Sequence, residues 1–505
     1  MRLWALLGAL ALCAFGAMPA LAEEKTLEER VKQLEKMIQD MKEEEKRERE
    51  GVPPGVERPE VLRPEAPSAE PGVGSLPEVG RERRAPTQPA LSFGSTGSGR
   101  LVYAKPFVAA PKAIVGGYMD IQWRAQRKGS IENGYGGISS NFDQQRFVPF
   151  IYADVTEHVK IASEIEFEHA IRETDSSEIS LEFGHIDYLI REPINLRAGI
   201  ILLPIGKFNL LHDSPLNDLT DRPLVSQLVI PTTIPETGAG IYGTFYPTRL
   251  SKMDYELYVT TGPCGYDTDG TPRISEQNGT RNARQRKCPT EDGFDINNGK
   301  AVVGRMAFSP VLGVEVAGSG YYGNSSPAFS SSYTPLSILA LDWTLQRGRW
   351  ELIGEAAWAY ARGNSRAIQG NTIGVPPGPA PAPGSVLTGI GGNGGMGIPP
   401  QRMNGFYIQG NYHFMPEFLT KLSPKRFGEG SILTAVIRYD RVNTNLDNSS
   451  SGFGDLEQIS FGLNYRPIED AAFKMSYQYQ PMAFNANTDQ RIHDSAFVIS
   501  AATYF

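Results

Sequence analysis

Most of the chain alternates apolar and polar residues with a period of two. In one such segment Met119, Ile121 and Trp123 would lie on one face of an extended strand, and Asp120 and Arg124 on the other. These segments approach the roughly 9 to 11 residues with which a tilted strand crosses a membrane, whereas strands of a soluble sandwich average about five or six. The alternation therefore predicts strands with one lipid face and one aqueous face.

Short turns and long loops alternate between these segments. Short turns are expected at 155–158, 191–193, 246–248, 347–349 and 466–469, and long loops at roughly 262–298 and 362–401. Outer-membrane barrels connect their strands in this way, with short periplasmic turns and longer external loops. We count about 16 strands and predict an all-β fold, a transmembrane antiparallel β-barrel over residues 113–505 that encloses an aqueous lumen.

The first residues have the pattern of a secretory signal peptide. Arg2 precedes the apolar stretch 3–17, and Ala20-Leu21-Ala22 offers small residues for cleavage, which assigns residues 1–22 to the signal. The stretch is shorter than the roughly 20 apolar residues of a membrane-spanning helix. Cys13 raises the alternative of a lipoprotein, but Leu12 precedes it where a small residue is expected.

Two further segments separate the signal from the barrel. Residues 23–50 repeat apolar positions at heptad spacing, namely Leu27, Val31, Leu34, Ile38 and Met41. We predict a short periplasmic coiled coil there, with a solitary amphipathic helix as the alternative. Residues 51–112 are rich in Pro, Gly and charged residues at first, which predicts an extended linker.

Composition narrows the possible functions. The chain contains 21 Tyr, 23 Phe and 53 Gly, and no long apolar run follows the signal peptide. This excludes a helical membrane protein and fits a barrel, whose strands hide only half of their residues in lipid. The net charge of -8 argues against a nucleic-acid partner. We expect no cofactor and no metal.

One long polar loop carries two cysteines of an exported chain. Cys264 and Cys288 are expected to form a disulfide across this loop, because the compartment is oxidising. The same loop contains residues 267–270, Asp-Thr-Asp-Gly, which resemble the start of a calcium loop without its later ligands. A plain turn is the preferred interpretation.

The stretch from Pro204 to Leu224 mixes apolar, charged and proline residues and does not alternate. A segment that folds back into a lumen needs this mixture, with apolar residues against the wall and charges facing water. We predict an inserted constriction loop at about 204–237. Its candidate constriction residues are Lys207, His212, Asp213, Asp218, Asp221 and Arg222, together with the strand residues Arg124, Arg197, Glu164, Glu166 and Glu168. The ordinary alternative is that most of these charges are a solvated barrel face and that Asp218 and Asp221 cap turns or pair with Arg222.

Several short motifs around this loop resemble one porin family. They are Ala198-Gly199, Pro204-Ile205-Gly206, Asp218-Leu219-Thr220, Arg222-Pro223-Leu224 and Gly238-Ala239-Gly240. The pattern resembles the phosphate-selective porin O/P family over residues 113–505. The resemblance implies sixteen-stranded trimeric barrels with an inward-folded third loop, some with an N-terminal coiled coil.

Phosphate selectivity in that family depends on lumen arginines and clustered lysines. Here acidic residues such as Glu164, Asp254 and Asp342 alternate with the inward basic residues. The sequence therefore does not favour phosphate selectivity over general diffusion.

The last strand ends at Phe505. It resembles the final strand of outer-membrane proteins, whose terminal aromatic residue contributes to recognition by the barrel-assembly machinery. An ordinary aromatic-girdle residue is the alternative.

These features together predict an outer-membrane porin with a periplasmic N-terminal segment. We expect a homotrimer that passes small hydrophilic solutes or ions, anions such as phosphate among them. A structural tether that reaches the cell wall through the coiled coil is the first alternative. A barrel enzyme is the second, but His212-Asp213-Ser214 is consecutive, and consecutive side chains of an extended chain point to different faces.

Overall fold

The structure is a computed structural model. It describes residues 113–127, 139–169, 178–267, 272–284, 299–326, 333–362, 400–424, 426–428, 430–447, 454–485 and 490–505. The predicted signal peptide, coiled coil and linker lie outside the described residues, as does Cys288.

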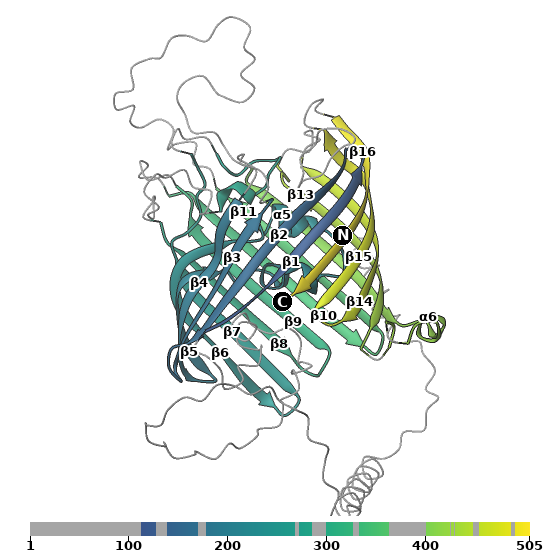
Figure 1. Cartoon of the computed structure of the whole chain (residues 1–505). Coiled ribbons are helices and arrows are strands. Elements are labelled where there is room, and N and C mark those ends of the chain that lie inside the picture. Colours follow the sequence, from purple (N-terminus) through teal and green to yellow (C-terminus); the bar gives the residue numbers. More distant parts are fainter. Residues whose placement is uncertain are drawn as a thin grey trace, which may run out of the picture. The chain divides into compact units, whose positions relative to one another are not determined.

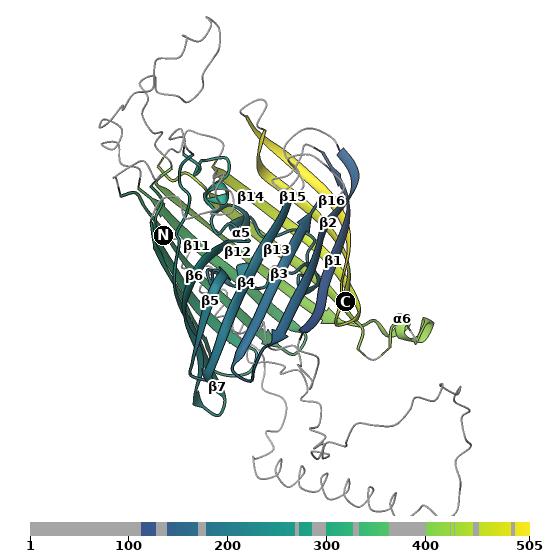
Figure 2. The same cartoon turned by 60° about the vertical axis from the view of Figure 1, so that its left-hand side comes forward.

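Sixteen strands in the described part of the chain form one closed antiparallel barrel (Figures 1 and 2). They are β1 (Ala113–Gln126), β2 (Ser139–Asp154), β3 (Val159–Glu168), β4 (Glu178–Arg191), β5 (Ile194–Leu202), β6 (Pro235–Thr248), β7 (Ser251–Thr260), β8 (Ala301–Ser309), β9 (Val314–Asn324), β10 (Pro335–Arg347), β11 (Trp350–Ala361), β12 (Arg402–Phe414), β13 (Ile432–Asn443), β14 (Asp455–Ile468), β15 (Ala471–Asn485) and β16 (Gln490–Tyr504).

The first and last strands close the ring. In the β1–β16 ladder Tyr118 lies opposite Tyr504, and the backbone N–H and carbonyl of Gly117 bond those of Phe505 at 3.1 and 3.0 Å. Each strand otherwise pairs with its sequence neighbours, so no edge is left open. The predicted fold class and strand number are confirmed.

The connections alternate in length around the ring. The chain reverses within two residues between β4 and β5, β6 and β7, β10 and β11, and β14 and β15. The connection from β12 to β13 is longer and contains α6 (Glu417–Leu422).

Two turns come later in the chain than the sequence predicts. Thr248 still pairs with Ser251, and Ile468 with Ala471, so β6 includes all of the expected turn 246–248 and β14 includes all of 466–469 except Glu469. Pro247 is tolerated because it lies in the register shift between Phe245 and Thr248, where the ladder does not use its missing N–H.

The two faces of the strands separate as the alternation predicts. On β1, Met119 and Ile121 are exposed on the outer face, whereas Asp120, Gln122 and Arg124 are buried on the inner face. The same holds on β10, where Leu339 and Leu341 are exposed and Asp342 is buried. The outer face is thus apolar, as a surface in contact with lipid must be. Among the described helices, none has the length and apolar character needed to span a membrane.

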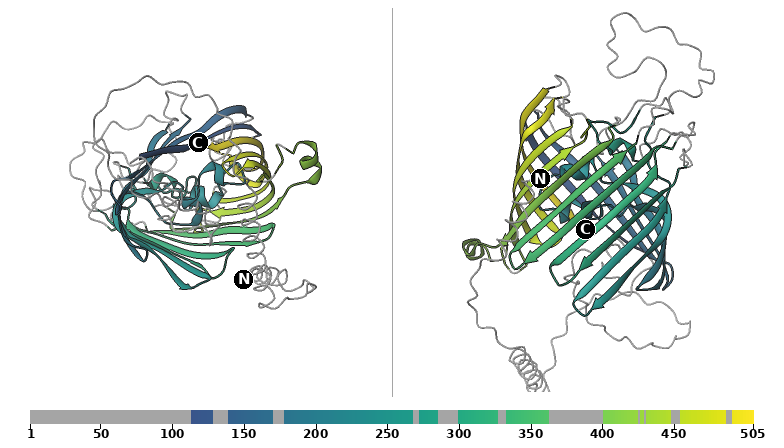
Figure 3. Two further views of the ribbon diagram at one scale, coloured as in Figure 1. Left: turned by 60° about the horizontal axis from the view of Figure 1, so that its bottom comes forward. Right: turned by 180° about the vertical axis from the view of Figure 1, so that it is seen from behind.

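Residues 203–234 connect β5 to β6 and lie inside the barrel (Figure 3, left, in teal). This inserted segment contains α4 (Lys207–Leu210), η1 (Ser214–Leu216) and α5 (Leu224–Leu228). Prolines interrupt any continuation of the ladder, since Pro204 follows β5 and Pro223 precedes α5. Its residues are all buried except Lys207, Leu210, Leu211, Asp213, Leu216, Asn217, Asp218 and Arg222.

Candidate functional site: the inserted segment and the barrel wall

An apolar cluster fastens the inserted segment to one side of the wall. Helix α5 contacts β11, β12 and β13. Val225, Leu228 and Ile230 belong to one buried cluster with Met403 and Tyr407 of β12. Burying one such side chain contributes about 1.5–3 kcal/mol, so this cluster stabilises the docked position of the inserted segment.

The turn into α4 also depends on close contact with the wall. Gly206 has φ of +67°, and a side chain at this position would collide with the Glu355 carboxylate of β11. The Gly206 N–H donates to Ser319 Oγ at 2.9 Å, and the Phe208 N–H donates to Glu355 Oε2 at 3.1 Å. Glycine is favoured here because φ is positive, and a Cβ would also displace the Glu355 carboxylate that binds this turn.

A buried ion pair holds the middle of the inserted segment. Arg124 of β1 binds the Asp221 carboxylate, and the two side chains are 2% and 7% exposed. Arg438 of β13 donates to the Asp221 carbonyl at 3.0 Å and to Asp440 Oδ2 at 2.8 Å. Asp440 in turn accepts from the Leu224 N–H at 3.1 Å. Burial raises the pKa of the Asp221 carboxyl, but the charge and hydrogen bonds of Arg124 outweigh burial and leave that pKa below its usual value.

Asp218 lies where water reaches the inserted segment. Its carboxylate accepts from Asn411 Nδ2 at 2.9 Å and from Asn464 Nδ2 at 2.7 Å, and Arg466 Nη2 lies 3.5 Å away. The side chains of Asp218 and Arg466 are 14% and 16% exposed. Earlier in the same segment, the Ser214 carbonyl accepts a hydrogen bond from Lys474 Nζ at 2.7 Å.

Three other predicted residues complete the water-accessible set. Lys207 Nζ donates to Thr344 of β10 and lies 3.6 Å from Glu315. Asp213 accepts from the Tyr504 hydroxyl at 2.7 Å. Arg222 Nη1 donates to the Thr232 carbonyl at 2.9 Å. The inserted segment therefore presents a mixture of acidic and basic groups to the lumen.

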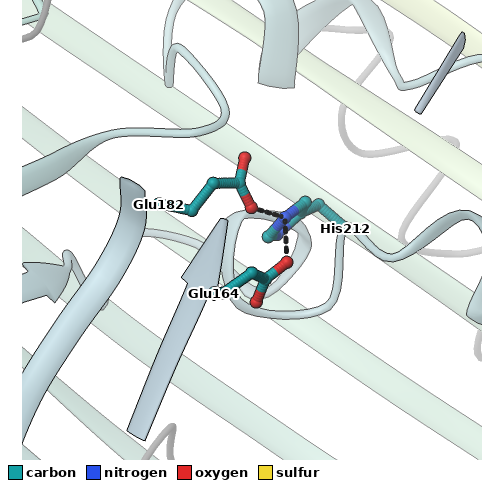
Figure 4. A group of neighbouring side chains, drawn as sticks. All are labelled: Glu164, Glu182 and His212. Atoms are coloured by element: carbon teal, nitrogen blue, oxygen red, sulfur yellow. Dashed lines mark hydrogen bonds and ion pairs between the residues drawn. The ribbon is translucent and has the colours of Figure 1, made fainter. Parts of the chain in front are cut away.

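His212 lies in a buried cluster of side chains next to strands β3 and β4 (Figure 4). Its Nε2 is 2.7 Å from Glu182 Oε2 on β4 and 3.9 Å from Glu164 Oε1 on β3. Glu166, also on β3, pairs with Arg146 at 2.9 Å and lies 3.9 Å from Arg222. The structure thus brings the predicted Glu164 and Glu166 against the predicted loop residues His212 and Arg222.

Two predicted residues pair within the wall instead. Arg197 binds Asp187 through bonds of 2.8 and 2.7 Å and lies 4.7 Å above the Tyr242 ring. Glu168 pairs with Arg146 at 3.0 Å.

Cys264 lies buried at the start of the β7–β8 loop, and its pairing with Cys288 stays a prediction.

Sequence reasoning missed Glu182. The register between β3 and β4 shifts between Glu164 and Ile165, so that Glu182 is an extra residue on β4. Glu182 and Phe183 are consequently both buried, although they are adjacent. A β-bulge re-aims a side chain in this way, and strict alternation cannot find it.

The consecutive His212-Asp213-Ser214 does not form a catalytic relay. Ser214 Oγ donates to Asp120 at 2.6 Å, whereas His212 faces Glu182 and Asp213 faces Tyr504. The three side chains have three different partners, so they do not form a Ser–His–Asp relay with one another.

Comparisons with known proteins give weak likenesses. No protein-family model matches the chain, and the resemblance to the phosphate-selective porin O/P family is therefore not confirmed. A protein of Aquifex aeolicus (strain VF5) described as uncharacterized is 25% identical over 370 residues, which cover 72% of this chain and 74% of that protein.

Three solved structures illustrate the structural likeness. The outer membrane channel DcaP of Acinetobacter baumannii has a TM-score of 0.46 at 9% identity, over 78% of this chain and 97% of its own. An anion-selective porin from Comamonas acidovorans has a TM-score of 0.44 at 9% identity, over 78% and 99%. OmpT of Vibrio cholerae has a TM-score of 0.41 at 8% identity, over 78% and 97%. Likenesses of this size decide nothing about function.

Proposed function

We propose that the protein is an outer-membrane porin, a passive channel for small hydrophilic solutes or ions. The observation that carries this proposal is the inserted segment 203–234, which is fastened inside a closed sixteen-stranded barrel by an apolar cluster and by buried ion pairs. A barrel that serves only as an anchor needs no such segment. In a channel such a segment has a role, because charges at a narrow point in a low-dielectric wall set which ions pass.

The proposed constriction is balanced in charge. The charged residues of the inserted segment that water reaches are Lys207 and Arg222 on the basic side, and Asp213 and Asp218 on the acidic side. Because the segment presents two charges of each sign to water, we expect it to discriminate only weakly between cations and anions. General diffusion is therefore our proposal, rather than phosphate selectivity.

The inserted segment narrows the lumen of the barrel. Inward wall residues such as Asp120, Glu355 and Asp440 are 0% exposed in the presence of the inserted segment. We therefore expect a small single-channel conductance for a barrel of sixteen strands. Displacement of the segment would enlarge it.

The remaining features of the proposal concern assembly. We propose a homotrimer in the outer membrane with the N-terminal coiled coil in the periplasm. The barrel-assembly machinery would recognise the C-terminal strand, where Phe505 is 60% exposed and stacks on Phe147 with ring centroids 5.8 Å apart. An exposed terminal aromatic residue on the last strand supports this role.

Planar-bilayer recording tests the proposed function. The wild type is compared with a variant in which residues 207–230 are replaced by a short Gly/Ser linker and which is first shown to fold as a barrel. We expect small steps for the wild type, larger steps for the variant, and a wild-type reversal potential in a salt gradient close to zero. Absence of steps from both proteins contradicts the porin, and a strong anion preference of the wild type contradicts the balanced constriction.

A further inference from the structure

Three potential metal ligands from different parts of the chain meet inside the barrel. Glu164 comes from β3, Glu182 from β4 and His212 from the inserted segment. One ligand atom of each lies within 4.8 Å of the others, and all three residues are buried. Figure 4 shows both carboxylates directed toward the imidazole.

The imidazole is oriented with one nitrogen facing the carboxylates. His212 Nδ1 lies 3.0 Å from the Asn209 carbonyl oxygen, which only accepts, so Nδ1 carries a hydrogen. This leaves Nε2 directed at Glu182 Oε2 and Glu164 Oε1. Metal-binding histidines commonly donate their other N–H to a carbonyl, which fixes the ring and the tautomer.

The Glu182 carboxylate is held from its other side. Thr233 Oγ1 donates to Glu182 Oε1 at 2.7 Å, and Glu182 Oε2 faces His212 Nε2. The bulge at Glu182 directs this extra side chain into the lumen. The site is therefore built from two separate parts of the inserted segment and from a local irregularity of the wall.

Glu164 supplies an oxygen that has no hydrogen bond within the described structure. Its side chain is only 4% exposed, and Oε1 is buried without a hydrogen-bond partner. A buried carboxylate oxygen without a donor is costly, because the charge loses its hydration. This oxygen faces the cluster, so a cation there would satisfy it.

The nearby basic residue is already engaged. Arg146 binds Glu166 at 2.9 Å and Glu168 at 3.0 Å. The carboxylates of Glu164 and Glu182 both face the His212 imidazole, and a doubly charged ion between the three side chains would balance their charge. An imidazole with two carboxylates is a ligand set for Zn²⁺ and similar ions, whereas Mg²⁺ and Ca²⁺ prefer oxygen ligands alone.

We propose that Glu164, Glu182 and His212 bind a divalent first-row transition-metal ion, and that this ion fastens the inserted segment to β3 and β4. Bonds of about 2.0–2.2 Å in tetrahedral geometry place two ligand atoms about 3.4 Å apart, so Glu182 Oε2 must move slightly away from His212 Nε2, and Glu164 Oε1 must move closer to it. Rotation of the Glu164 side chain, whose Oε1 is otherwise unbonded, provides this adjustment. The site is independent of what the barrel conducts.

Metal content tests the site on the full-length barrel purified from outer membranes. Zinc is the probe, and it is measured by elemental analysis in protein as isolated, after removal by a chelator, and after incubation with Zn²⁺ and gel filtration. The variants are His212→Gln and Glu182→Gln. His413→Gln is the matched control, because His413 Nε2 lies 3.4 Å from one carboxylate, that of Glu351. Heat-modifiable migration confirms that each variant folds.

We expect about one zinc per chain in the wild type and in His413→Gln. His212→Gln and Glu182→Gln should bind zinc at least about 100-fold more weakly, since each lacks a ligand. X-ray absorption of the loaded wild type should show the outer-shell scattering of one imidazole ring beside light first-shell ligands. Zinc retention by folded His212→Gln equal to that of the wild type overturns the proposal. So does the absence of zinc from the wild type as isolated and after incubation, which would mean that the two carboxylates share a proton instead.

Discussion

Replacing Asp221 by asparagine tests whether its ion pair holds the inserted segment in place. Asp221→Asn keeps the size of the side chain and removes the charge that Arg124 binds. Both partners are buried, at 7% and 2% exposure, so Arg124 would be left with a buried and uncompensated charge. The backbone contact from Arg438 to the Asp221 carbonyl stays in place.

The expected cost follows from this burial. Removing one partner of a buried ion pair destabilises by about 3–5 kcal/mol, and asparagine recovers part of the hydrogen bonding, so we take about 3 kcal/mol. This free energy raises the ratio of displaced to docked segment about 150-fold. The apolar cluster around α5 still favours the docked state, so the segment should open intermittently.

Single-channel recording measures this opening, and Asp218→Asn is the matched control. Both substitutions remove one acidic charge from the inserted segment. Asp218 and its charge partner Arg466 are 14% and 16% exposed, so water can solvate Arg466 when the carboxylate charge is removed, and we expect Asp218→Asn to cost less than Asp221→Asn. Asp221→Asn should therefore show frequent transitions to a larger conductance, and Asp218→Asn should not.

The control has its own expected effect. An ion at 4 Å from a unit charge in water-like surroundings gains about 1 kcal/mol, which is roughly a fivefold factor. Asp218→Asn should shift the reversal potential toward anions by a permeability ratio of about that size. If both variants give the same steady conductance and unfold at the same urea concentration, the ion pair does not hold the segment.

Further outcomes follow from neighbouring contacts. Arg124 keeps the pKa of the Asp221 carboxyl below its usual value, so the ion pair stabilises fully above about pH 4 and loses its effect as pH falls through the lower folded pKa. The difference in urea unfolding between wild type and Asp221→Asn should therefore be constant from pH 7 to 5 and shrink in stronger acid. A decline of this difference already above pH 5 would contradict the role of the pair. Leu228→Ala should cost about 2–5 kcal/mol and increase current noise without moving the reversal potential, so a shifted potential with quiet current would oppose this role. Deletion of residues 23–90 should leave conductance unchanged in bilayers, whereas a tether predicts detached envelopes with unchanged solute uptake. Phe505→Ala should lower the yield of folded barrel in outer membranes, measured by heat-modifiable migration, and an undiminished yield would exclude the proposed recognition.

The barrel wall could be predicted from the sequence because lipid and lumen impose opposite demands on neighbouring residues. Met119 and Asp120 are adjacent, and their different exposure follows from their chemistry alone. The positions of the turns were harder to predict from the sequence. Between β6 and β7, for example, Thr248 still pairs with Ser251, and the residue types there do not indicate this pairing. Glu182 was missed for the same kind of reason, because a bulge shifts it out of the alternating register.

The interior of the inserted segment was predictable only in its general character. Its mixture of apolar and charged residues predicted insertion, but not the short helices α4 and α5. The partner of each charge was also hidden, because Arg124 and Asp221 are 97 residues apart and meet only when the barrel closes around the segment. Long-range pairs of this kind depend on the strand order and register.

The pairing of lumen charges changes what the acidic composition means for selectivity. Counted along the sequence, inward carboxylates weaken the case for an anion channel. In the structure, however, Asp342 is bound by Arg305 and Asp187 by Arg197. A buried carboxylate next to a guanidinium contributes little field to a passing ion, because the two charges nearly cancel at a distance. Selectivity should therefore follow the few charges that water reaches on the inserted segment rather than the total, and single substitutions at Lys207 or Asp218 should move the reversal potential more than substitution of a complete wall pair such as Arg305 with Asp342.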